Sequence, residues 1–197
     1  MSVQSHPRST AMEENSRARR LTALTGRSLA YGALLPLMAL AALPTVLFGR
    51  AGTALSWWRA LRTRVLAAPP VEVRRRAGWL PVAGHGLLSL LLGAAALPPL
   101  GVQLLMVLRG ILYGLVVPGP YDHAWGGPTL AGAWVVHFLV GIPTSAAGLA
   151  LLLAIAALHQ RLTAALDGQR LRPWVRPVAL LICAAMGLFF VAWLHQI

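Results

Sequence analysis

Four long apolar runs, separated by short polar segments, set the pattern of the chain. They support predicted helices at 29–48, 83–108, 129–166 and 178–194. A helix needs about 20 apolar residues to cross the hydrocarbon core of a bilayer, and each run approaches or exceeds that length. The pattern therefore predicts an all-α, multi-pass transmembrane helix bundle with about four spanning helices.

A shorter amphipathic stretch, 53–67, lies between the first two runs. Its apolar positions recur at helical spacing: Leu55, Trp58, Leu61 and Val65. Its arginines fall mostly on other faces, and Trp57 adds an aromatic group typical of the membrane interface. This stretch predicts an interfacial amphipathic helix that ends before Pro69.

Composition strengthens the membrane interpretation. The chain of 197 residues is 57% hydrophobic and 11% charged, whereas soluble domains carry about 25% charged residues. Its net charge is +12, and all 17 basic residues are arginine. The arginines cluster at the ends of apolar runs without a nucleic-acid motif, so the expected partner is the lipid bilayer and not nucleic acid. The single cysteine, Cys183, excludes an intrachain disulfide.

The distribution of arginine predicts the orientation. Seven arginines lie in 50–82 and four in 159–176, but one lies in 109–128. The positive-inside rule then puts the first two segments in the cytoplasm and the loop 118–128 outside a plasma membrane. Residues 1–27 read as a disordered polar tail. Their five arginines favour the cytoplasm, but a single crossing at 29–48 puts them outside. A hairpin over 29–58 is the alternative, and the side of the tail stays open.

The segment "PGPYDHAWGGPTLAGAW", residues 118–134, concentrates polar and aromatic chemistry between two apolar runs. The candidate signal- or ligand-binding residues are Arg109, Tyr121, Asp122, His123, Trp125, Trp134 and His137. In a structural interpretation, the glycines and prolines make turns, Thr129 caps a helix and Asp122 pairs with Arg109. In a functional one, the same groups line an outward-facing pocket. The sequence leaves both open.

His137 is the strongest single candidate. It lies about two turns inside the third predicted helix, where an ionisable group usually faces the bundle or a cavity. Histidine can act as a proton-sensitive switch, although a structural hydrogen bond is the alternative. His123, His137, His195 and Asp122 offer possible metal ligands. Hydrogen bonding is the commoner role of such groups, so we expect no metal and no cofactor.

Two other features bear on packing. His85 lies one helical turn before Ser89 and can reach it. Ala146, Ala150 and Ala154 form a stripe of small residues that suits close packing within the chain or in a homodimer.

Familiar catalytic motifs are absent from the sequence, including GxSxG, HExxH, the Walker loop and CxxC. The chain has five carboxylates, and two of them lie in the tail. We therefore expect no enzymatic activity. A small transporter or channel subunit would need a polar path built from His85, Ser89, Gln103 and His137. A structural scaffold is the third possibility.

Three stretches resemble the multi-pass sensor domain of actinobacterial membrane proteins. They are "GHGLLSLLLG" at 84–93, "LRGILYGLVVPGPYDHAWGGPTLAGAWVVHFLVGIP" at 108–143 and "LHQRLTAALDG" at 158–168. That domain forms the membrane input end of some sensor histidine kinases and also occurs in stand-alone proteins. The resemblance implies a membrane sensor domain over 28–168, followed by a linker and a C-terminal transmembrane helix over 169–197. The expected function is non-enzymatic: the loop detects an outer or membrane signal and a separate kinase or regulator receives it.

Overall fold

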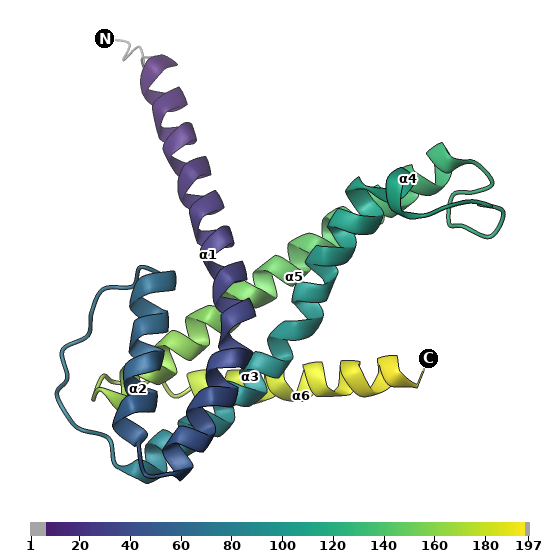
Figure 1. Cartoon of the computed structure of the whole chain (residues 1–197). Helices are drawn as coiled ribbons and strands as arrows, with labels where there is room; N and C mark the ends of the chain where they lie inside the picture. The colour runs from purple at the N-terminus through teal and green to yellow at the C-terminus, as the bar shows by residue number, and fades with distance from the viewer. Residues whose placement is uncertain (1–6, 196–197) are drawn as a thin grey trace.

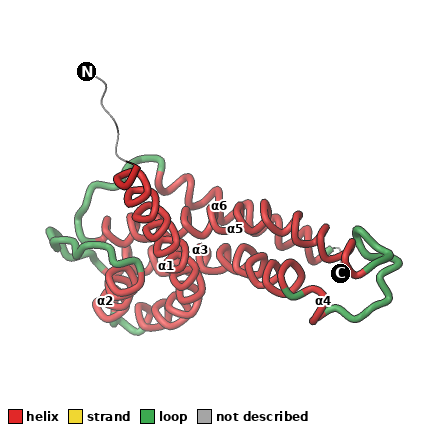
Figure 2. Tube along the Cα trace, turned by 90° about the horizontal axis from the view of Figure 1, so that it is seen from above, coloured by secondary structure: helices red, strands yellow, loops and turns green. Residues whose placement is uncertain are grey.

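The computed structural model describes residues 7–195, and within this range it contains helices and loops without a strand (Figure 2). Helices α3, α5 and α6, together with the apolar part of α1, are long and apolar enough to cross a membrane. The prediction of an all-α, multi-pass membrane protein with four spanning helices is confirmed. The elements are α1 Pro7–Leu47, α2 Ala51–Ala60, the π-helical η1 Leu61–Val65, α3 Trp79–Leu105, the π-helical η2 Met106–Ile111, α4 Tyr113–Val116, α5 Leu130–Leu166 and α6 Val175–Leu194.

Helices α3 and α5 run side by side in opposite directions and form the axis of the bundle (Figure 1). Two glycines of α5 leave room for side chains of the facing helices, because Gly141 lies against Met106 of η2 and Gly148 against Gln103 of α3. Helix α1 runs antiparallel to the first half of α3. There Gly93 of α3 lies directly against the backbone of Pro36. Such small residues let membrane helices approach without a side chain between them.

The core lies where α1, α3 and α5 meet. Its largest fully buried apolar residues in this region are Tyr31, Leu35, Leu92, Leu152 and Ile155. A second cluster joins the end of α1 and the start of α3 to α2. This helix buries Ala54, Leu55 and Trp58. The amphipathic helix predicted at 53–67 is therefore present as α2 and η1, with its apolar face packed on the bundle.

The predicted disordered tail is corrected over most of its length. Residues 1–6 lie outside the described residues, but α1 begins at Pro7 and continues without interruption to Leu47. The side chains of 12–24 are exposed, so tertiary packing does not hold this part. It is rich in Ala, Arg, Glu and Leu, which favour helix, and it extends a buried helix that is already nucleated. Polarity here therefore predicts exposure, not disorder.

Over 29–58, α1 continues as one helix to Leu47. A tight turn at Gly49, with φ of +79°, then returns the chain as α2 along α1. The last helix, α6, contacts the bundle mainly near its start, where Val175 and Ala179 are buried (Figure 1).

Candidate functional site

The predicted loop forms an aromatic cap at the N-terminal end of α5. We use the name aromatic cap for Tyr113, Tyr121, Trp125 and His137. The His137 ring lies 4.5 Å from that of Tyr113 and 6.3 Å from that of Trp125, between centroids. Tyr113 also lies 6.3 Å from Tyr121. Three of the seven predicted site residues therefore meet here, together with Tyr113, which the sequence analysis did not select.

Local hydrogen bonds fix the loop below the cap. Thr129 is the N-cap of α5, as predicted, and its hydroxyl accepts a hydrogen bond from the Gly132 N–H at 3.1 Å. Gly126 has a φ of +81°, a conformation that side chains with a Cβ rarely adopt. The indole N–H of Trp134 donates to the Gly110 carbonyl at 2.9 Å. That carbonyl lies in the last turn of η2, where the helix offers no partner.

The remaining predicted residues do not join the cap. Asp122, His123 and Arg109 are exposed, and Asp122 forms no ion pair with Arg109 among the described residues, so that predicted pair is wrong. His137 donates from Nδ1 to the Ala133 carbonyl at 2.8 Å, which is a structural hydrogen bond within α5. Over 12–195 the structure contains no group of three His, Cys, Asp or Glu residues placed to hold a metal ion.

A buried His–hydroxyl network, formed by Tyr31, His85, Ser89, His159 and Thr163, lies near the opposite end of the bundle. The two nitrogens of His159 bond to the hydroxyls of Tyr31 at 2.6 Å and Ser89 at 2.8 Å. His85 bonds through Nε2 to the Thr163 hydroxyl at 3.2 Å. Each of the five residues is 6% exposed or less. The network ties α1, α3 and α5 together where water is excluded.

The hydroxyl donors fix the direction of these bonds. Ser89 donates to the His85 carbonyl at 2.6 Å, and Thr163 donates to the His159 carbonyl at 3.0 Å. Both hydroxyl oxygens must therefore accept from the histidine Nε2–H groups. In a neutral imidazole, Nδ1 of His159 then accepts, so Tyr31 donates. Two antiparallel helices thus carry the same His-x-x-x-hydroxyl unit, and each histidine binds the hydroxyl of the other helix.

An ion pair closes the end of α5 beyond this network. Arg59 of α2 donates from Nε to the carboxylate oxygens of Asp167 at 3.0 and 3.3 Å, and its terminal nitrogen also contacts the same carboxylate. Asp167 is 1% exposed. Its backbone carbonyl accepts from the Arg74 N–H at 3.0 Å, and Gly168 lies against Arg74 and Arg75. The end of α5 therefore positions the exposed arginine-rich segment 74–76.

The polar residues that a transport path would need lie in three separate places. His85 and Ser89 belong to the His–hydroxyl network. Gln103 bonds to Ser145, whose hydroxyl donates to Gln103 Oε1 at 2.6 Å. His137 belongs to the aromatic cap. Each group already has a hydrogen-bond partner within the protein.

Comparison with known proteins adds no relative: no family model, no curated protein and no solved structure matches the chain.

Proposed function

We propose that the chain is a non-enzymatic membrane sensor or accessory protein of the plasma membrane, in which α5 and α3 couple the aromatic cap to the arginine-rich segment 74–76. A signal would act at the cap, and a separate kinase or regulator would read the segment. Two arrangements of the bundle that differ by a few kcal/mol are enough for such a switch.

One observation carries the proposal: the two ends of α5 hold two different sites. Trp134 and His137 lie in its first two turns, against Gly110 of η2 and Tyr113 of α4. Asp167, directly after its last turn, bonds to Arg59 and to the Arg74 backbone. A displacement of α5 relative to α2 must therefore change the position of segment 74–76.

The segment 74–76 is suited to contact a partner. Arg74, Arg75 and Arg76 are exposed, and the one ion pair they make among the described residues joins Arg74 to Glu72 at 3.7 Å. Both of those side chains are well exposed, so the pair contributes little. The three guanidinium groups are therefore free to bind an acidic protein surface or anionic lipid headgroups.

Hydrogen–deuterium exchange in lipid nanodiscs tests the coupling. We expect a Trp134→Phe/His137→Ala variant to speed exchange in peptides covering 71–78 about 5-fold or more, the lower bound of a typical allosteric coupling. The matched control is Phe138→Ala, a neighbouring α5 side chain that is 40% exposed. If exchange rises in the loop but is unchanged at 71–78, the coupling does not exist.

Copurification in mild detergent tests the partner. A kinase or regulator that binds the wild type should be lost with Arg75→Gln/Arg76→Gln. It should be retained with Arg170→Gln/Arg172→Gln, which removes the same charge from another exposed loop. An identical set of bound proteins from the wild type and both variants would favour a structural scaffold.

A further inference from the structure

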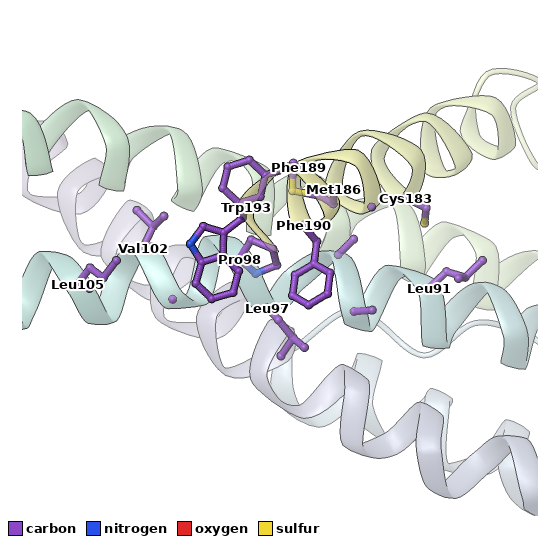
Figure 3. Close-up of a pocket in the computed structure, with 14 residues that line it drawn as sticks. Leu91, Leu97, Pro98, Val102, Leu105, Cys183, Met186, Phe189, Phe190 and Trp193 are labelled. Atoms are coloured by element: carbon purple, nitrogen blue, oxygen red, sulfur yellow. The ribbon is translucent and has the colours of Figure 1, made fainter. Parts of the chain in front are cut away.

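An apolar groove opens between α3 and α6 (Figure 3). Its volume is about 500 Å³. No lining side chain carries a charge, and the indole of Trp193 supplies the one side-chain nitrogen. The larger side chains that line it include Leu91, Pro98, Leu105, Met186, Phe190 and Trp193.

The groove exists because α6 leaves the bundle after its first turns. Val175 and Ala179 are fully buried, but Phe190 is 49% and Trp193 51% exposed. Both α3 and α6 are long and apolar enough to span a membrane, so the groove faces hydrocarbon. Neither water nor a polar ligand finds hydrogen-bonding partners there.

The shape and surroundings of the groove favour a hydrocarbon chain as its occupant. It follows α3 from Leu91 to Leu105, which corresponds to a length of about 21 Å at the helical rise. It is elongated, apolar and open on the side that faces the membrane. The acyl chains of the bilayer are in direct contact with that side, and an extended chain matches the groove in shape and in chemistry.

We propose that this groove binds one acyl chain of a bilayer phospholipid. The bound chain lies along α3 between the levels of the aromatic cap and the His–hydroxyl network, and it contacts α3 and α6 at once. It fills the space that α6 leaves and holds the C-terminal half of α6 on the bundle.

Two glycines allow the groove to be filled without disturbing the protein. A Cβ at Gly101 or at Gly187 meets nothing within 4 Å, and both residues line the groove. Gly84, also in α3, has the same open space but does not line the groove. Gly101→Leu/Gly187→Leu is thus the blocking variant, and Gly84→Leu is its control.

Native mass spectrometry measures the retained lipid directly. The full chain is reconstituted in dioleoyl phosphatidylglycerol nanodiscs and extracted in mild detergent. We expect the wild type and Gly84→Leu to retain one lipid, and the blocking variant to retain at least ten-fold less. Equal retention in all three proteins overturns the proposal, as does a wild-type dimer that the blocking variant loses without any change in bound lipid.

Cys183 supplies a second readout, because its thiol lines the groove and is the one thiol in the chain. Alkylation by N-ethylmaleimide should be several-fold slower in the wild type with the phospholipid than after delipidation. In the blocking variant, adding lipid should leave the rate unchanged. A wild-type rate that does not respond to lipid overturns the proposal, and this arm holds even if the blocking variant fails to fold.

Discussion

Breaking the Arg59–Asp167 ion pair should destabilise the protein by amounts that depend strongly on which partner is removed. The two side chains differ in exposure, at 34% for Arg59 and 1% for Asp167. Arg59→Met leaves a carboxylate buried without its cation. Removing one partner of a buried pair costs about 3–5 kcal/mol, and we expect this variant to fall in that range.

Asp167→Asn should cost much less. The amide oxygen of asparagine still accepts a hydrogen bond, and the partly exposed guanidinium of Arg59 can turn toward water. The expected loss is about 1 kcal/mol, the usual contribution of one hydrogen bond. The double variant, Arg59→Met/Asp167→Asn, buries no uncompensated charge, so it should be more stable than Arg59→Met alone.

Reversible unfolding in mixed micelles, with all four proteins at one lipid-to-detergent ratio, measures these differences. The order of stability should be wild type, Asp167→Asn, the double variant, and Arg59→Met last. Equal losses in the two single variants, or a double variant that loses their sum, would show that desolvation of Asp167 does not set the energy of this pair.

Three further predictions test local features of the fold, each by the same unfolding assay. A Cβ at Gly93 would lie 2.7 Å from the α1 backbone, so Gly93→Ala should cost about 1–3 kcal/mol. Gly101→Ala should be neutral or slightly stabilising. Equal effects of the two variants would contradict the close approach of α1 to Gly93. Tyr31→Phe should cost about 0.6 kcal/mol, the average for a hydrogen bond in a membrane bundle. It should also shift the ¹⁵N resonance of His159 Nδ1, and an unchanged resonance would refute Tyr31 as the donor. Thr129→Ala should cost about 1 kcal/mol through the lost cap, and Thr129→Ser should be close to wild type, so a similar loss in both would exclude capping as the cause.

The spanning helices could be predicted from the sequence because apolar runs encode them locally. The third predicted helix, 129–166, differs by one residue from α5, which begins at Leu130. Thr129 and Gly168 mark the two ends of this helix. Such end signals can be recognised in the sequence because they act on neighbouring residues. In the aromatic cap, Tyr121, Trp125 and His137 were selected for the same reason, since one short segment carries them.

The His–hydroxyl network and the Arg59–Asp167 pair depend on contacts between distant segments and were therefore missed. The spacing of His85 to Ser89 and of His159 to Thr163 is visible in the sequence as a repeated four-residue step. The bonds that these residues make depend on the antiparallel register of α3 and α5. This register pairs Ser89 with His159, 70 positions away, and His85 with Thr163, 78 positions away. Arg59 and Asp167 are separated by 108 positions. The pair of Asp122 with Arg109 was predicted because the two residues are near each other in the sequence. The acidic residue that is buried and forms an ion pair is instead Asp167.

Pro143 constrains how any coupling between the two ends of α5 can work. It lies between the aromatic cap and the His–hydroxyl network, and its missing N–H weakens the helix at that point. A movement carried by α5 alone could be absorbed there. A second connection runs through α3 and its continuation η2. Gly110 of η2 accepts from Trp134 on the N-terminal side of the proline, and Gln103 of α3 accepts from Ser145 on its C-terminal side. A signal that passes Pro143 must therefore move α3 and α5 as a pair, and the His–hydroxyl network is the place where that pair is joined to α1.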